Sequence, residues 1–304
     1  MCCLFGIYNY SGKSVKNLSH LTNCLAAEAT ERGHDAAGIA YNNNGKLLIH
    51  KESKSALELT FKHPDNPVCI MGHTRHSTQG SEKKNYNNHP FFGRCKNLNF
   101  ALAHNGVLTN DYALRKELRL PHTKIETDSY IAVQLIEKKK ELCMESVKFM
   151  AEKVKGSFSF SLLDSDDALW LIRGDNPLTM LHLPEYELFI YASTSEILYR
   201  ALIETKLFDT VKRGNTEEIE PSPGDIIKIL PEGRILRDNF NYSEYINYGR
   251  FCWWDYDVSK SNNQSYIEDL KEVAKSLGFA PKDIDDMVSQ GFSPEEIEDF
   301  IYCL

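Results

Sequence analysis

The sequence has few of the features that would direct it to a membrane or stabilise it covalently. None of its 304 residues falls in an apolar run near the roughly 18 residues of a membrane-spanning helix. The first residues form no basic segment followed by a long apolar one, so we predict no secretory signal, no membrane partner and a cytoplasmic location. The eight cysteines are scattered, with no CxxC pair. This spacing excludes a small disulfide scaffold, and we interpret six of the cysteines as reduced thiols, mostly in the core.

The chain also has no excess of positive charge, since 43 acidic residues outnumber 35 basic ones. The formal net charge is -8, and residues 265–304 alone hold ten acidic residues and three lysines. The rest of the chain is nearly neutral, whereas nucleic-acid-binding domains carry clustered basic residues. We therefore expect no nucleic-acid partner. The hydrophobic content of 42% is that of a globular protein with a sizeable core.

Hydrophobic patterning predicts a layered α+β domain, because runs of strands are separated by runs of helices rather than alternating regularly. The expected strands cover residues 4–10, 37–42, 46–51, 68–72, 99–104, 157–164, 168–173, 187–192, 226–230 and 234–238. The first expected helix begins at residue 18 and ends before Gly33. The other expected helices cover 110–118, 127–140, 144–154 and 194–204.

The character of the sequence changes after Asp238. We predict a main domain at 2–240, a linker rich in Asn, Ser, Tyr and Trp at 241–264, and an acidic extension at 265–304. The extension reads as two or three short amphipathic helices. One of them has a good start, since Ser293 can cap it and Pro294 suits the first turn.

Cys2 is the first residue with a specific chemical reading. Removal of Met1 would expose its α-amine, whose reference pKa of about 8 lets it act as a base near neutral pH. Thiol and amine would then form a nucleophile–base pair within one residue. Many proteins begin with Met-Cys by chance, so this position alone predicts nothing.

Five polar motifs follow along the chain: ERGHDAAGI at 31–39, GHTRHSTQG at 72–80, NNHPF at 87–91, AHNGVL at 103–108 and ETDS at 126–129. For some residues of these motifs a purely structural role would also explain the sequence. Arg75 fits a substrate carboxylate but is by default a surface residue. Asp128 can cap the helix that follows it. Asn105-Gly106 is a favoured hairpin turn, which could also present its N–H groups outward.

In this order, the motifs resemble those of the glutaminase domain of class II glutamine amidotransferases, over about residues 2–240. The resemblance implies a four-layer αββα sandwich of the N-terminal-nucleophile hydrolase type, with the helical extension added to it. It also implies that the thiol attacks the side-chain amide of glutamine, forms a thioester, and releases glutamate and ammonia without a cofactor or metal.

The same resemblance assigns roles to individual residues. Those it places at the reacting centre are Cys2 as nucleophile, Asn105 and Gly106 as oxyanion hole, and Arg32 near the nucleophile. Those it places around the glutamine amino-acid group are Arg75 at the carboxylate, Asp128 at the ammonium, and Thr78 with the backbone of His76 and Gly106.

The sequence departs from the family pattern at several positions. Cys3 and Leu4 replace the usual Gly-Ile, His76 stands where an aromatic residue is common, and Gln79 where histidine is common. Four histidines (73, 76, 89 and 104) suggest a metal site, but no known ligand spacing is met, so we interpret them as satisfied structural histidines.

Three functions remain open. The first is a half-enzyme that supplies ammonia to a separate acceptor or synthase subunit, with the acidic extension as a docking element. The second is a stand-alone amidohydrolase of γ-glutamyl compounds. The third is a non-catalytic glutamine-binding regulatory module. Neither the acceptor nor the oligomeric state can be predicted from the sequence.

Overall fold

Two β-sheets form the centre of the main domain. The computed structural model describes residues 2–14, 17–205, 216–242, 271 and 280–289. The seven-stranded sheet has the order β11 (Glu217–Ile219), β9 (Thr179–Leu183), β10 (Leu188–Ala192), β1 (Cys3–Asn9), β4 (Cys69–Arg75), β2 (Ala36–Asn43), β3 (Lys46–Glu52). The six-stranded sheet has the order β13 (Ile235–Asn239), β12 (Asp225–Ile229), β8 (Leu169–Arg173), β7 (Gly156–Asp164), β6 (Asn99–Leu108), β5 (Phe91–Arg94). Neighbouring strands are antiparallel throughout both sheets.

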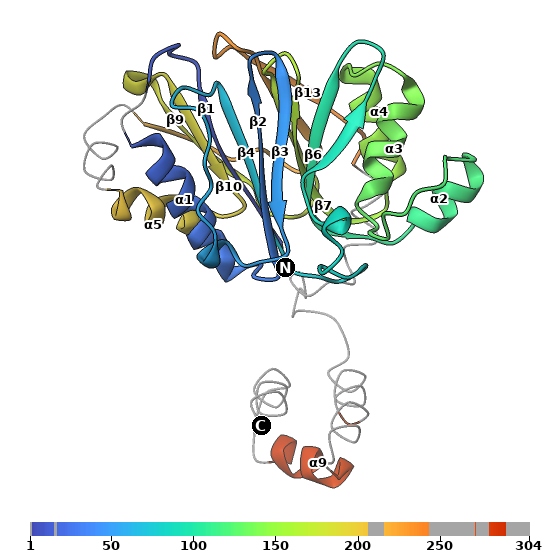
Figure 1. Cartoon of the computed structure of the whole chain (residues 1–304). Coiled ribbons are helices and arrows are strands. Elements are labelled where there is room, and N and C mark those ends of the chain that lie inside the picture. Colours follow the sequence, from blue (N-terminus) through green and yellow to red (C-terminus); the bar gives the residue numbers. More distant parts are fainter. Residues whose placement is uncertain (1, 15–16, 206–215, 243–270, 272–279, 290–304) are drawn as a thin grey trace. The chain divides into compact units, whose positions relative to one another are not determined.

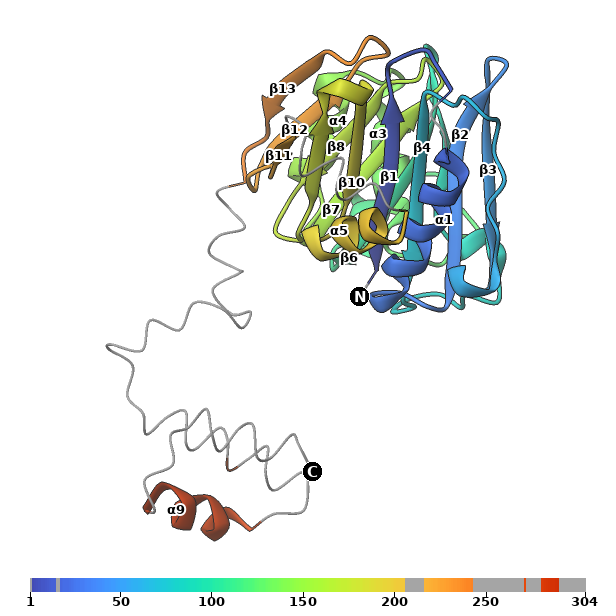
Figure 2. The same ribbon diagram turned by 90° about the vertical axis from the view of Figure 1, so that its left-hand side faces the viewer.

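Helices cover the outer faces of both sheets. Helices α1 (Leu18–Glu28) and α5 (Ser195–Glu204) lie on the seven-stranded sheet, and α2 (Asp111–Glu117), α3 (Tyr130–Lys139) and α4 (Met144–Lys153) lie on the side of the six-stranded sheet (Figures 1 and 2). Short 3-10 helices occur at Ala29–Glu31, Ala56–Glu58, Asn85–Asn87 and Pro184–Tyr186. The predicted αββα sandwich is confirmed by these four layers.

Three apolar clusters hold the layers together. One, with Leu21 and Leu25, packs α1 and α5 against the seven-stranded sheet. A second, with Ile131 and Leu135, packs α3 and α4 against the six-stranded sheet. The third lies between the sheets and includes Met71. The central strands β1, β4 and β10 are therefore covered on both faces, which explains why they are buried along their whole length.

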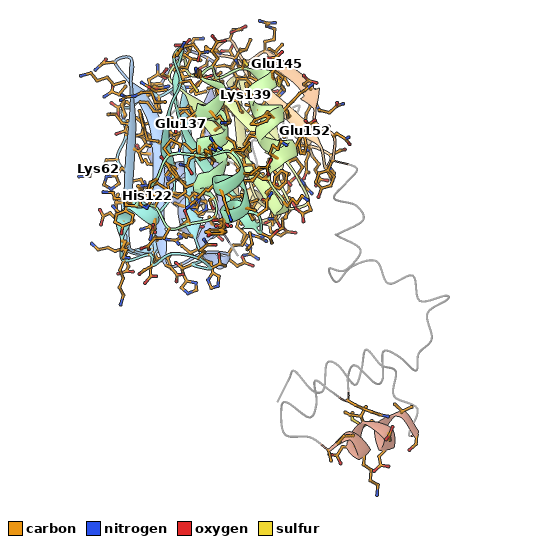
Figure 3. The ribbon with its side chains drawn as sticks, turned by 90° about the vertical axis from the view of Figure 1, so that its right-hand side faces the viewer. Lys62, His122, Glu137, Lys139, Glu145 and Glu152 are labelled. Atoms are coloured by element: carbon orange, nitrogen blue, oxygen red, sulfur yellow. The ribbon has the colours of Figure 1, made fainter. Side chains whose placement is uncertain are left out.

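The outer surfaces of the helices are polar. Lys139 on α3 and Glu145 and Glu152 on α4 are exposed (Figure 3). The buried residues of α4, Ser146, Val147, Met150 and Ala151, repeat at helical spacing, whereas α3 is buried on all sides from Ile131 to Ile136. No helix in the described ranges is long and apolar enough to cross a membrane.

The structure contains three strands that the sequence did not predict: β5, β9 and β11. The predicted strand at 99–104 is longer than expected, because β6 continues to Leu108. Asn105 and Gly106 therefore lie inside a strand, opposite Ser159 and Phe158 of β7. The hairpin-turn reading of these two residues is wrong, since pairing with β7 overrides their local turn preference.

By its contacts the chain divides into two compact units, Met1–Asn247 and Tyr248–Leu304. Of the second unit the structure describes Lys271 and residues 280–289, which include α9 (Pro281–Ser289). Apart from Asn241 and Tyr242, the predicted linker at 241–264 lies outside the described residues, as does most of the acidic extension, so the domain limits at 240 and 264 stay a prediction.

Candidate active site

Cys2 directly precedes strand β1, which lies in the middle of the seven-stranded sheet. Its Sγ is 3.4 Å from the backbone nitrogen of His76 and 3.5 Å from the carbonyl oxygen of the same residue. Arg32 donates from Nε to the Cys2 carbonyl oxygen over 3.2 Å. Burial raises the pKa of the Cys2 thiol, while the His76 N–H and the charge of Arg75 act in the opposite direction. The thiol is therefore protonated near neutral pH and needs a base before it can attack.

Cys3 has a different environment from Cys2. Successive residues of a strand point to opposite faces, and Cys3 and Phe5 pack in the cluster under α1 and α5. The Cys3 thiol is fully buried, it donates to the Leu4 carbonyl oxygen over 3.2 Å, and burial raises its pKa to about 11. These features make Cys3 an inert core residue.

Asn105 is held by hydrogen bonds to two residues that lie just outside strands, Ser193 after β10 and Asn176 between β8 and β9. Its Nδ2 donates to Ser193 Oγ over 3.3 Å, and its backbone carbonyl accepts from Asn176 Nδ2 over 2.8 Å. Ser193 Oγ also accepts from the Leu4 N–H over 2.9 Å, so one hydroxyl connects β1 with this amide. An amide nitrogen carries two N–H groups, and the second remains a possible donor for a substrate oxygen.

Gly106 has a backbone that other residues rarely adopt. Its φ is 143°, and an added Cβ would lie 2.0 Å from the Ser157 carbonyl oxygen. Glycine is therefore required beside Asn105 by the close approach of β7.

Arg75 ends β4 and is buried, so the surface reading is wrong. Its guanidinium donates to Asn88 Oδ1 over 2.7 Å, and to the carbonyl oxygens of Gln79 and Gly80 over 2.8 and 2.6 Å. These bonds use three of its five N–H donors and fix the loop that follows β4. Thr78 is exposed on this loop, as is the side chain of His76.

Asp128 is buried in front of α3 rather than placed as a cap. Its Oδ2 accepts from the Leu108 N–H over 2.6 Å, and Ser129 Oγ donates to Oδ1 over 3.3 Å. The negative charge of Asp128 raises the pKa of the Cys2 thiol, and the positive charge of Arg75 lowers it. One cationic and one anionic group therefore act on the thiol together.

Three buried histidines lie behind the site. The rings of His73 and His89 are 4.1 Å apart between centroids, and His73 Nε2 lies 2.9 Å from the His104 carbonyl oxygen. Neither ring nitrogen of His89, nor Nδ1 of His73, has a partner among the described residues. The interpretation of His73 and His89 as satisfied residues is therefore wrong, whereas both ring nitrogens of His104 lie within hydrogen-bond distance of Ser129 Oγ and the Ser157 carbonyl oxygen. These three histidines form no candidate metal cluster in the described part of the chain.

These histidines predict acid sensitivity. Burial lowers the pKa of His73 from 6.5 to about 3, and burial also lowers those of His89 and His104. Between pH of about 6.5 and 3 the unfolded chain takes up protons at these positions that the folded chain does not. We expect the free energy of unfolding to fall across this window as pH decreases, on the order of 4 kcal/mol from His73 alone.

Urea denaturation at a series of pH values measures this effect. The pH dependence should weaken in His73→Gln, whose amide can still donate to His104, and should persist in His50→Gln, which alters an exposed histidine. Equal slopes in His73→Gln and the unaltered protein between pH 3 and 6.5 would contradict the assignment.

His34 and Asp35 form a second polar group beside the nucleophile. His34 Nε2 is 3.4 Å from Asp35 Oδ1, and His76 Nδ1 is 3.9 Å from Asp35 Oδ2. His34 and His76 are 42 positions apart in the sequence, so linear spacing gives no sign that they meet.

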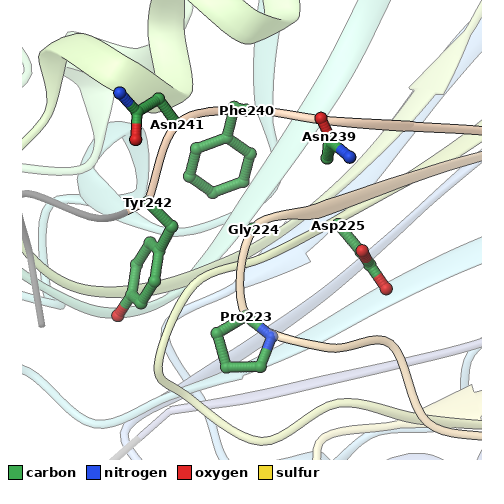
Figure 4. Close-up of a pocket in the computed structure, with 7 residues that line it drawn as sticks. All are labelled: Pro223, Gly224, Asp225, Asn239, Phe240, Asn241 and Tyr242. Atoms are coloured by element: carbon green, nitrogen blue, oxygen red, sulfur yellow. The ribbon is translucent and has the colours of Figure 1, made fainter.

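A hollow on the same domain contains none of the predicted site residues. It is lined by Pro223, Gly224, Asp225, Asn239, Phe240, Asn241 and Tyr242 (Figure 4). Of the side chains there only Asp225 is charged, and none is a nucleophile of the kind expected for amide hydrolysis.

Sequence reasoning assigned no role to Ser193 and Asn176. Both lie outside the five motifs given above, and the role of a hydroxyl or amide that acts through another residue becomes visible only in the folded chain. Their hydrogen bonds with Asn105 are the evidence that they position this residue.

Comparison with known proteins relates the chain to a family of enzymes. Residues 73–200 match the family model described as a glutamine amidotransferase domain. The chain is 30% identical over 302 residues to a glutamine–fructose-6-phosphate aminotransferase of Sulfurisphaera tokodaii, covering 95% of this chain and 47% of the relative. It is 29% identical over 256 residues to an amidophosphoribosyltransferase of Methanocaldococcus jannaschii, covering 81% and 50%.

Solved structures share the fold. Glutamine phosphoribosylpyrophosphate amidotransferase from B. subtilis superimposes with a TM-score of 0.59 at 21% identity, over 79% of this chain and 49% of that one. The allosteric regulatory enzyme of purine biosynthesis gives a TM-score of 0.61 at 22% identity, with the same coverage. The fold is thus that of the N-terminal-nucleophile hydrolases.

The chain contains a class II glutamine amidotransferase domain and through it belongs to a family of enzymes. It is related to glutamine–fructose-6-phosphate aminotransferase and to amidophosphoribosyltransferase. It spans about half the length of the relatives from S. tokodaii and M. jannaschii.

Proposed function

We propose that this chain hydrolyses the side-chain amide of glutamine through Cys2, giving glutamate and ammonia. The observation that carries the proposal is the setting of the Cys2 thiol. It contacts the backbone of His76 and is influenced by the opposite charges of Arg75 and Asp128. A site with one buried cation and one buried anion suits a free amino acid, which carries both charges itself.

The mechanism begins with removal of Met1. The freed α-amine of Cys2 takes the thiol proton as sulfur forms a bond to the side-chain carbonyl carbon of glutamine. Because burial raises the pKa of the Cys2 thiol, the thiol needs a base beside it, and the α-amine of the same residue can be that base. Asn105 Nδ2 and the Gly106 N–H stabilise the oxyanion that forms.

The tetrahedral intermediate formed by this attack then breaks down. The protonated amine gives its proton to the departing nitrogen, the C–N bond breaks and ammonia leaves a γ-glutamyl thioester on Cys2. Water hydrolyses the thioester, which releases glutamate and restores the thiol. Every proton in this cycle is carried by Cys2 itself or by water.

The remaining residues orient the substrate. We assign the glutamine carboxylate to Arg75, with Thr78 and the His76 backbone beside it, and the ammonium to Asp128. Arg32 fixes the carbonyl of the nucleophile residue through its 3.2 Å hydrogen bond. Because Arg75 already binds the carbonyls of Gln79 and Gly80, it also shapes the loop that borders the substrate.

The use of the ammonia is a further part of the proposal. Both relatives are named for transfer reactions, and this chain corresponds to about half of each. We propose that ammonia passes to an acceptor site on a separate subunit, with the acidic residues of 265–304 as docking element. A cytoplasmic location remains a prediction from the sequence.

Asp128→Asn tests the substrate assignment. The asparagine oxygen can still accept from Leu108 N–H, so the fold should persist while the negative charge is lost. We expect the KM for glutamine to rise about 10- to 100-fold, as hydrogen bonds to charged groups contribute about 1.5–3 kcal/mol. Asp238→Asn, at a half-buried carboxylate paired with Lys148, is the matched control.

Glutamate release from glutamine and from a γ-glutamyl anilide should be measured side by side. Faster turnover of the anilide, with no dependence on Asp128, would reject glutamine as the substrate and favour the stand-alone amidohydrolase.

A further inference from the structure

We propose that His34, Asp35 and His76 form a binding site for a divalent transition-metal ion of the zinc class. Each side chain offers one ligand atom, and the three atoms lie within 4.8 Å of one another. Two imidazoles and one carboxylate are ligands preferred by zinc, cobalt and nickel over magnesium and calcium. Three protein ligands leave one position of a tetrahedral ion open.

The distances between the ligand atoms are near those of a metal site. Ligands at about 2.0–2.2 Å from a tetrahedral ion are separated from one another by about 3.3–3.6 Å. His34 Nε2 lies 3.4 Å from Asp35 Oδ1, and His76 Nδ1 lies 3.9 Å from Asp35 Oδ2. The two imidazole rings are 5.7 Å apart between centroids. Small rotations of two exposed side chains are enough to close the set around an ion.

Asp35 is fixed by the backbone rather than by the histidines. Its N–H donates to the Arg75 carbonyl oxygen over 2.9 Å, and its Oδ2 accepts from the Ser77 N–H over 2.7 Å. Such a hydrogen bond behind a ligating carboxylate orients it for the metal. Gly33 permits this close approach, because a Cβ there would lie 2.7 Å from the Thr74 carbonyl oxygen and from the Arg75 carbonyl carbon.

The position of the site couples it to the nucleophile. His76, whose Nδ1 is one of the three ligand atoms, also contacts Cys2 Sγ through its backbone N–H and carbonyl oxygen. An ion at this site would restrain the His76 backbone and add positive charge at the entrance to the substrate site. We therefore infer that metal binding slows glutamine hydrolysis. This consequence rests on the proposed function, whereas the binding site itself does not.

A matched pair of variants separates this site from other metal binding. His34→Gln removes one ligand without changing a residue assigned to catalysis or substrate binding. His50→Gln is the control, because His50 Nε2 lies 3.4 Å from Glu52 Oε1 and forms the same kind of pair outside the three-ligand group. All cysteines are present in both variants, so metal binding by thiols affects them equally.

Calorimetric titration of the full-length chain with zinc chloride tests the proposal. We expect one saturable site per chain in the unaltered protein and in His50→Gln. We expect at least about tenfold weaker binding in His34→Gln, since changes even to residues that only hydrogen-bond a metal ligand cost about 10–100-fold in affinity. Cobalt should give intense visible absorption on the same variants, and calcium should not bind. Equal zinc affinity in His34→Gln and His50→Gln would overturn the site.

Turnover measured in the same titration tests the coupling. Glutamine hydrolysis should fall as the site fills, and His34→Gln should resist zinc at concentrations that inhibit His50→Gln. Full activity of the zinc-loaded protein would overturn the coupling and leave the site established. A protein without glutaminase activity would refute the proposed function, while the calorimetric result would still decide the site.

Discussion

Cys2→Ala is expected to abolish glutamine hydrolysis, lowering kcat by about 10⁴-fold or more, as removal of a covalent nucleophile does in other hydrolases. Cys3→Ala is expected to keep kcat within a few-fold of the unaltered protein. The reason is geometric: the Cys2 sulfur contacts the His76 backbone at the site, whereas the Cys3 thiol lies under α1 and α5. Alanine is also small enough for Met1 to be removed in the first variant.

Steady-state glutamate release from the two purified variants measures this difference, and thermal unfolding controls for stability. Cys3→Ala should lose some stability, since truncating a buried side chain leaves a cavity. Comparable activity in both variants would remove Cys2 from the mechanism. Loss of activity in Cys3→Ala alone would mean that the nucleophile has been assigned to the wrong cysteine.

Asn105→Ala has the second largest expected effect, a decrease in kcat of about 10²–10³-fold with little change in KM. Its amide would contact the substrate oxygen most strongly once that oxygen carries negative charge, so the loss should fall on the chemical step. Ser193→Ala should cause a smaller decrease, because Ser193 acts by holding Nδ2 through a 3.3 Å hydrogen bond.

The control for Asn105 is Asn42→Ala. The Asn42 amide donates to the Asp164 carbonyl oxygen and to Asp167 Oδ1, and Asn42 lies outside the site. A rise in KM with unchanged kcat in Asn105→Ala would contradict an oxyanion role and indicate a contact with ground-state substrate.

Much of the fold could be predicted because it follows from local pattern. The helix from Leu18 and the hairpin at 37–51 have the periodicities of their structures, and both were found. Strand β9 (Thr179–Leu183) was missed. It is five residues long, and its apolar run looks the same in a short strand as in a buried helix.

The site was harder to predict because its residues meet across the two sheets. Cys2, Arg75, Asn105 and Asp128 could be named only through their resemblance to a family. The turn preference of Asn105-Gly106 was misleading, since pairing with β7 decides the conformation. Nothing in the linear sequence brings His34 to His76. The backbone bond from Asp35 to Arg75 does so.

The central claim is that Cys2, freed of Met1, forms a covalent intermediate with glutamine. Mass analysis of the N-terminal peptide after rapid acid quench of the protein turning over glutamine tests this most directly. The account predicts a peptide that begins at Cys2 and carries one γ-glutamyl group on that residue, absent from Cys2→Ala. A peptide that retains Met1 in an active protein, or a γ-glutamyl group on Cys3, would contradict it.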